Sequence, residues 1–359
     1  MTTSSISGVS GVCISHPNSP ETEVFSMLWN TRSKTTASLP LRSGLTYDCV
    51  IYWGDGNSTS VVGTSPGTIT HDYGVAGEYQ IEISGEFQGF RFNNSGDRLS
   101  VKRIDSWGPS VFQRIERFFF GCNNIEYLAP GIKISPEATS WESAFKGLKN
   151  IVEFPFMDSS MATNLSNTWY DCRKLVNFPS IDISNAQNLT QAWQDCRRLT
   201  SFPALDTSSC TTLSRTWYNC INLISFPLIS IPLVTTIKDA WRNCNALASF
   251  PAIAMPEVVT ADLAWSNCYA LSSFPAIDFP KATTLNNTWS GCSSLVSFLA
   301  TGLSASTKIG PSNLDAPSLN TIYSNLATVS GQTLDVSGNP GTGNHNPSIA
   351  TAKGWTVLV

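Results

Sequence analysis

The chain carries little charge and few histidines, and it has no long apolar run. Asp, Glu, Lys and Arg make up 13% of its 359 residues, about half of the ~25% that is usual in soluble proteins. The net charge of −4 and the lack of any Lys/Arg run argue against nucleic acid as a partner, because phosphate contacts need clustered cations. No stretch of about 20 apolar residues is present, so we expect no membrane span.

The first residues, Met1–Pro20, lack the features of an export signal. They are rich in Ser, Gly and Thr, without the cationic start and apolar core of a signal peptide. Cys13 follows no apolar segment, so we expect no lipid anchor there. The three histidines (His16, His71 and His345) are scattered, and no Cys/His set has the spacing of zinc ligands. We therefore expect neither a metal nor a cofactor.

One tryptophan returns every 24 residues through the middle of the chain. Three other residue types keep the same register, with a cysteine three positions after each tryptophan, then a leucine and then a phenylalanine, each three positions further on. The tryptophan column is Trp169, Trp193, Trp217, Trp241, Trp265 and Trp289, and the cysteine column is Cys172, Cys196, Cys220, Cys244, Cys268 and Cys292. A period of 20 to 50 residues is typical of a solenoid, in which stacked coils bury a continuous core.

Within one coil the spacing changes from helical to extended. Leu189, Trp193 and Cys196 follow an i, i+4, i+7 pattern, which predicts one face of a helix. Residues 199–205 predict a short strand, because Pro203 stops a helix and holds the residue before it extended. We therefore expect an α/β solenoid, a leucine-rich-repeat-like array of 24-residue coils. Strands stack at about 4.8 Å and helices at about twice that, so this array would curve with its strands inside.

The aligned tryptophans and cysteines are interpreted as structural core. Adjacent helices lie about 8–10 Å apart, which exceeds the limit of about 7 Å between the Cα atoms of a disulfide. The cysteine column is therefore expected to hold free, buried thiols. The tryptophans share their side of the coil with Leu and Cys, which favours core over a row of sugar-stacking platforms. A serine column before the phenylalanines would form either a recognition surface or polar filling: Ser201, Ser225, Ser249, Ser273 and Ser297.

The two ends of the chain differ from the array. Residues 1–117 alternate apolar and polar positions, with a strand predicted at 47–53 and a tight turn at 54–57, which indicates a β-sandwich. The array itself occupies 118–300. Residues 301–359 are predicted to form a C-terminal cap, because the last coil would otherwise leave apolar surface exposed.

The cap is expected to contain four short elements. Leu319, Ile322, Tyr323 and Leu326 share one helical face, and a second short helix is predicted at 348–353. Strands are predicted at 333–336 and 355–357.

Two stretches resemble known families. The W-G-D-G turn at Trp53–Gly56 and the later H-D-Y-x-x-x-G-E-Y-x-I-x-I segment, which begins at His71, are similar to PKD-type (Ig-like) sandwich domains. The coils read F/W-x-x-C-x-x-L with a Pro-containing turn and a D-x-S return, as at Asp182–Ser184, and resemble BspA-type leucine-rich-repeat surface proteins. This pairing occurs in bacterial surface proteins and in bacteriophage structural proteins, so the resemblance implies adhesion or assembly rather than catalysis.

Six side chains beside the tryptophan column are candidates for contact with a partner. Two tyrosines could be exposed aromatic contacts, and two basic pairs at matching positions of two coils could form a patch for an acidic protein or an anionic polysaccharide. The six are Tyr170, Arg173, Lys174, Arg197, Arg198 and Tyr218. For the basic pairs a solvated helix end, where cations are favourable, is the stronger expectation. Asp55 could help to bind calcium, but calcium takes six to eight oxygen ligands, and a plain hairpin turn is the stronger expectation.

These observations lead to three functional hypotheses. We expect a non-enzymatic bacteriophage virion structural protein: an appendage, fibre or decoration subunit of a multi-subunit assembly that binds virion proteins or a host glycan or receptor. A bacterial cell-surface adhesin is the first alternative, and it would carry an export signal and an anchor. A polysaccharide-acting enzyme is the second. It would need paired carboxylates in a cleft, and the sequence offers no such pair and no familiar catalytic motif.

Overall fold

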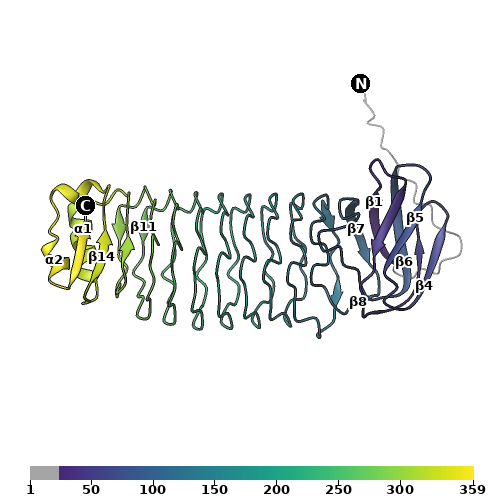
Figure 1. Cartoon of the computed structure of the whole chain (residues 1–359), viewed down its shortest axis with the longest axis horizontal. Helices are drawn as coiled ribbons and strands as arrows, with labels where there is room; N and C mark the ends of the chain where they lie inside the picture. The colour runs from purple at the N-terminus through teal and green to yellow at the C-terminus, as the bar shows by residue number, and fades with distance from the viewer. Residues whose placement is uncertain (1–23) are drawn as a thin grey trace, which may run out of the picture.

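The computed structural model describes residues 24–359, so the predictions for Met1–Pro20 concern residues outside the described range. The described chain forms a rod (Figure 1). A domain of antiparallel strands lies at one end, stacked coils make up the middle, and a small domain that contains two α-helices and a 3₁₀ helix lies at the other end.

The N-terminal domain is built from antiparallel strands. They are β1 (Phe25–Asn30), β2 (Thr36–Pro40), β3 (Thr46–Tyr52), β4 (Ser58–Thr64), β5 (Thr68–Asp72), β6 (Glu78–Phe87) and β7 (Val101–Trp107). The large sheet has the order β4-β3-β6-β1-β7, extended beyond β7 by β9 (Tyr127–Leu128), and β2 pairs with β5 in a second sheet. Tyr47, Cys49 and Ile51 of β3 are buried, as alternation along a strand requires. The turn at 54–57 joins β3 to β4, as the sequence predicts.

Strand β7 connects this domain to the rod. It pairs antiparallel with β1 on one side and parallel with β9 (Tyr127–Leu128) on the other. A second parallel pair consists of β8 (Val111–Phe112) and β10 (Lys133–Ile134). The indole N–H of Trp107 also donates to the carbonyl of Ala129, at 2.6 Å. The strand pairing therefore changes from antiparallel to parallel within one sheet, and the buried residues on both sides form one continuous core.

The coils contain no helix between residues 118 and 300, so the predicted α/β solenoid is wrong and the array is a β-solenoid. The segment around each tryptophan is a run of tight turns. Two residues per coil have positive φ, for example Gln191 (58°) and Asp195 (61°) on either side of Trp193. A left-handed residue cannot continue a right-handed helix. Leu189, Trp193 and Cys196 are all buried, but turns rather than a helix bring them to the same side.

Backbone hydrogen bonds alternate between the coil and its neighbour. Within a coil, the N–H of Cys196 donates to the carbonyl of Trp193 at 3.2 Å. Between coils, the N–H of Trp193 donates to Thr216 at 2.9 Å and that of Asp195 donates to Tyr218 at 2.8 Å. This alternation pairs the buried peptide groups, as burial requires, and it ties each coil to the next.

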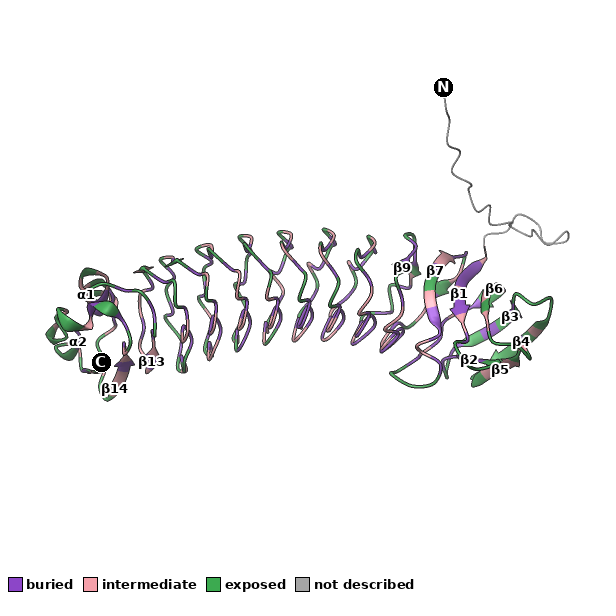
Figure 2. Ribbon diagram, turned by 90° about the horizontal axis from the view of Figure 1, so that it is seen from above, coloured by how far each residue is buried: buried purple, intermediate pink, exposed green. Residues whose placement is uncertain are grey.

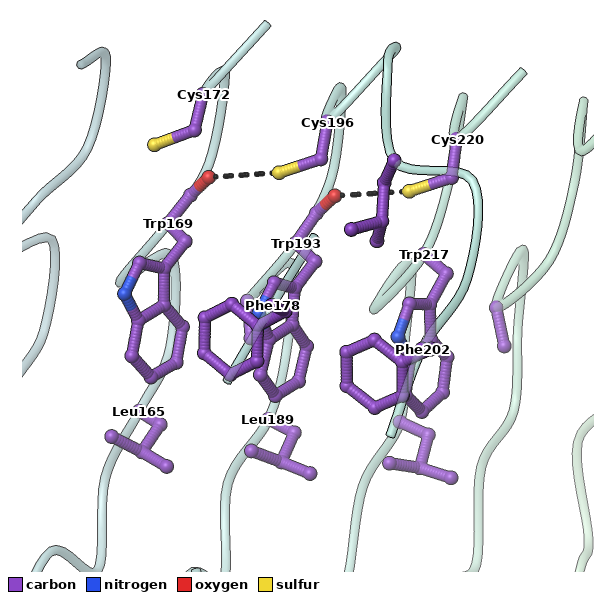
Figure 3. Packing of buried hydrophobic residues seen from close by; sticks show 14 of the residues in the cluster. Leu165, Trp169, Cys172, Phe178, Leu189, Trp193, Cys196, Phe202, Trp217 and Cys220 are labelled. Carbon is purple, nitrogen blue, oxygen red and sulfur yellow. Dashed lines mark hydrogen bonds between the residues drawn. The ribbon is translucent and has the colours of Figure 1, made fainter. Parts of the chain in front are cut away.

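The tryptophan column lies in the core, as its periodicity predicts (Figure 3). All six indoles are 0% exposed, and successive rings stack with centroids 5.0 to 5.9 Å apart. Phe202 packs edge-on against Trp193 at 4.8 Å and Trp217 at 5.2 Å. Within the described chain the six indole Nε1 atoms have no hydrogen-bond partner, so ring packing alone holds them in place.

The cysteines of the column are free and buried as predicted, but the argument from helix spacing was wrong. Rings of successive coils lie only 5.0 to 5.9 Å apart, so distance alone does not prevent disulfides. Instead, each thiol donates to a backbone carbonyl of the preceding coil, as Cys196 does to Trp169 and Cys220 to Trp193, both at 3.3 Å, and Cys172 to Phe145 at 3.5 Å. Burial raises the pKa of these thiols well above its ordinary value, which keeps them protonated as donors.

The segment after each coil's leucine is extended, as predicted. It forms regular strands only in the first coil, as β9, and in the last coils, where β11 (Ser273–Phe274) pairs in parallel with β12 (Ser297–Phe298). The serine column is exposed to solvent on this side, except for the half-buried Ser297. Because no helix widens the other side, the coils follow at most a shallow arc instead of the curve predicted for an array of strands and helices (Figure 1 and Figure 2).

The C-terminal domain consists of short parallel strands and helices. Its elements are β13 (Thr307–Lys308), α1 (Ala316–Asn325), β14 (Gln332–Asp335), the 3₁₀ helix η1 (Pro340–Gly343), α2 (Ser348–Thr351) and β15 (Trp355–Leu358). The three strands form a parallel sheet in the order β13-β14-β15. Asp315 caps α1 by accepting from the N–H of Ser318. Leu319, Ile322 and Tyr323 of α1 are buried, which confirms the predicted helical face.

Candidate functional site

The six candidate contact residues lie over successive coils beside the tryptophan column. Residues 24 positions apart occupy equivalent places in adjacent coils, so Arg197 follows Arg173 and Arg198 follows Lys174 at a step of about 4.8 Å. All four of these cationic side chains are exposed. We call the whole set the basic edge: Tyr170, Arg173, Lys174, Arg197, Arg198 and Tyr218.

Two aspartates partly neutralise the basic edge. The Nε of Arg173 lies 2.5 Å from Asp171, and the Nη2 of Arg197 lies 3.0 Å from Asp195. The aspartates are largely buried, whereas both guanidinium groups are almost half exposed. The hydrogen bond to Asp171 raises the pKa of Arg173. Because four cations face two carboxylates, the edge keeps a positive charge toward solvent.

Both tyrosines of the edge are half-buried and lie under cations. The Nζ of Lys146 lies 4.2 Å from the ring centroid of Tyr170, and the guanidinium of Arg242 lies 5.8 Å from that of Tyr218. Burial, with a smaller effect from Asp195, raises the pKa of Tyr170. Cation–π contacts of this kind hold the rings in place, and they leave each ring only partly available to a partner.

A ladder of amides continues from Asp195 along the coils, and the sequence reasoning missed it. The side-chain amide of Asn219 donates to Asp195 at 3.0 Å, that of Asn243 to Asn219 at 2.7 Å, and that of Asn267 to Asn243 at 2.9 Å. All four residues have positive φ. The signal was present as a column of Asp, Asn or Gly two positions after each tryptophan, since these residues tolerate the left-handed region best.

The Asp55 carboxylate is hydrogen-bonded within its own turn and to the neighbouring strand β5. It accepts from the backbone N–H and the amide of Asn57, both at 3.0 Å, and lies 2.7 Å from Nε2 of His71. Trp53 stacks on His71 at 4.9 Å. Burial would raise the pKa of Asp55, but the hydrogen bonds from Asn57 and His71 lower it to about 2. Among residues 24–359, no three His, Cys, Asp or Glu side chains are placed to hold a metal ion.

Two small hollows lie near the N-terminal end of the rod. One of about 290 Å³ lies between residues 85–88 and 109–113, and its only acidic residue is Glu86. The other, of about 40 Å³, lies beside Trp141, and its only acidic residue is Asp158. Neither hollow brings together the two carboxylates that glycoside hydrolysis uses in most families.

No protein-family model matches the chain, and no curated protein matches it. In the part of the chain that the structure describes, no helix has the length and apolarity needed to cross a bilayer. The class of protein that the structure defines is a β-solenoid of 24-residue coils after an antiparallel sheet domain.

Proposed function

We propose that the chain is a non-enzymatic structural subunit of a bacteriophage virion: an appendage, fibre or decoration protein that binds an acidic protein or an anionic host glycan. The observation that carries this proposal is the basic edge, where exposed cations stand in register on two adjacent coils. The resemblance of the coils and of the W-G-D-G turn to BspA-type and PKD-type proteins supports a place in adhesion or assembly.

The solenoid suits such an edge because it fixes the spacing of the cations. Arg173 and Arg197 are held by Asp171 and Asp195, and each coil is hydrogen-bonded to the next. Cations that are already ordered lose less side-chain entropy when a partner binds. A polyanion with regularly spaced charges is therefore a suitable ligand for these coils.

Immunoelectron microscopy of purified phage particles, with an antibody raised against this chain, tests whether the chain is part of the virion. We expect label on an appendage or on the capsid surface, together with the intact chain in the mass spectrum of the particles. Label confined to the bacterial envelope, with none on particles, would refute the virion proposal in favour of the adhesin.

The binding role is tested with a matched pair of charge-reversal variants and polygalacturonate as the polyanion. Lys174→Glu combined with Arg198→Glu should weaken binding about tenfold, since each exposed charge contributes up to about 1 kcal/mol. Arg32→Glu combined with Lys133→Glu makes the same change in net charge away from the edge and should leave the affinity unchanged. Equal losses in both variants would refute the edge, and release of reducing ends from the polymer would indicate an enzyme.

A further inference from the structure

The extended side of the coils carries apolar residues at a period of three coils. Val152, Ile224 and Val296 are 72 residues apart and are 46%, 56% and 49% exposed. Phe156 and Leu228 repeat this interval and are 62% and 65% exposed. Successive coils hydrogen-bond in register here, so these apolar ridges stand about 14 Å apart, three steps of the strand spacing.

Small residues occupy the coils between the ridges. In the column of Phe156 and Leu228, the intervening residues are Ser180, Ala204, Ala252 and Ala276, and all of them are exposed. We call this side the extended face: residues 152–156, 176–180, 200–204, 224–228, 248–252 and 272–276. Glu153 is its only charged residue. A lack of charge is typical of the buried centre of a protein interface.

The order large, small, small, large, small, small is complementary to its own reverse. If a second copy faces the first with its coils in the opposite order, a two-fold axis between the third and fourth coils places every ridge of these six coils over a small residue, and Val296 lies beyond the sixth coil. Phe156 then lies opposite Ala276, and Leu228 lies opposite Ala204. In the neighbouring column Val152 lies opposite Ser272 and Ile224 opposite Thr200, and the half-buried Val176, a second apolar residue between these two ridges, lies opposite Ala248. A parallel arrangement of the two rods would instead set each ridge against a ridge.

We propose that the extended face binds a second copy of this chain in an antiparallel, two-fold symmetric dimer. Such an interface uses the same patch on both copies. The face is about 29 Å long and about 17 Å wide from strand dimensions, so two copies would bury about 1,000 Å² in total, the lower limit for a specific interface. The dimer therefore forms in a concentration-dependent equilibrium. This inference stands independently of the basic edge, because it uses other residues and needs no polyanion.

The first test is sedimentation velocity over a concentration series. The wild-type chain should shift from monomer to dimer as its concentration rises, and Leu228→Glu should remain monomeric because it would bury a charge against Ala204 of the other copy. Val62→Glu places the same charge on β4, at a residue that is 75% exposed, and should dimerise like the wild type. A wild-type chain that stays monomeric throughout the series, or a Leu228→Glu chain that still dimerises, overturns the proposal.

The second test fixes the direction of the two rods with a short bismaleimide crosslinker. The described cysteines are all buried, so a Cys13→Ser background removes the one cysteine outside the described range. Glu153→Cys chains mixed with Ser273→Cys chains should crosslink, since these residues face each other across about 10 Å. Glu153→Cys alone should not crosslink, because its two copies lie about 26 Å apart. Crosslinking of Glu153→Cys alone would show a parallel dimer and overturn the antiparallel arrangement.

Discussion

Replacing the central tryptophan of the stack tests how the solenoid is stabilised. Trp217 stacks between Trp193 at 5.9 Å and Trp241 at 5.4 Å, and it meets Phe202 and Phe226 edge-on at 5.2 and 4.7 Å. Trp217→Ala removes four aromatic contacts, each contributing about 0.5–1.5 kcal/mol beyond burial. The coils on both sides are hydrogen-bonded to their neighbours and cannot collapse into the cavity, so we expect a loss of about 3–5 kcal/mol.

Urea denaturation followed by circular dichroism measures this loss, and hydrogen exchange locates it. Protection should fall mainly in the coils next to residue 217, because each coil contacts only its neighbours. Trp217→Phe should lose less than half as much, since the indole Nε1 has no partner to forfeit and Phe145 fills the equivalent place in an earlier coil. Tyr269→Ala, at a residue 47% exposed, is the surface control. If Trp217→Ala unfolds at the same urea concentration as this control, the stacked core is not what holds the coils together.

Two further predictions concern a turn in the coils and a turn in the N-terminal domain. Asn219 has a φ of 60° and bonds to Asp195 and Asn243, so Asn219→Val should destabilise the chain by about 1–2 kcal/mol more than Asn219→Gly, which loses the same ladder without backbone strain. Equal urea midpoints for the two variants would contradict the left-handed turn. The pKa of Asp55 is lowered to about 2, so its stabilising effect is complete above about pH 4, the ordinary range of a carboxyl group, and is lost as the pH falls toward 2. Asp55→Asn should flatten that part of the melting-temperature profile relative to wild type, and an unchanged profile would show that His71 and Asn57 do not stabilise the carboxylate.

The sequence predicts the stack of coils because the core repeats without error. Trp, Cys, Leu and Phe each recur every 24 residues, and only translation of one coil onto the next buries all four columns together. The sequence also predicts the buried helical face of Leu319, Ile322 and Tyr323, because α1 is long enough for its apolar residues to recur with helical spacing. In both places burial of apolar side chains alone decides the structure.

The error over the helix has a specific physical cause. The spacing of Leu189, Trp193 and Cys196 fits a helix, but it also fits two consecutive turns that bring the same residues to one side. The deciding residues are Asp195 and its equivalents Asn219, Asn243 and Asn267, all with positive φ. Asp and Asn have low helix propensity. Their recurrence at one position of every expected helix therefore indicates turns instead.

The same error led to the wrong spacing for the cysteines. Helices would separate successive thiols by about 8–10 Å, whereas the turns let Cys196 reach the carbonyl of Trp169 at 3.3 Å. The amide ladder and the distance between the cations of the basic edge also depend on this close stacking. A stack with helical spacing predicts neither of them.

The exposed apolar residues follow a different period from the core, and that difference has a consequence for function. Packing inside the solenoid repeats with every coil, because each coil needs the same Trp and Phe to cover its neighbour. The packing of the core does not require Phe156 and Leu228 to be large while Ser180 and Ala204 between them are small. We therefore infer that the three-coil spacing on the surface matches a partner outside the rod. The reversed copy of this chain presents the same period at the right offset.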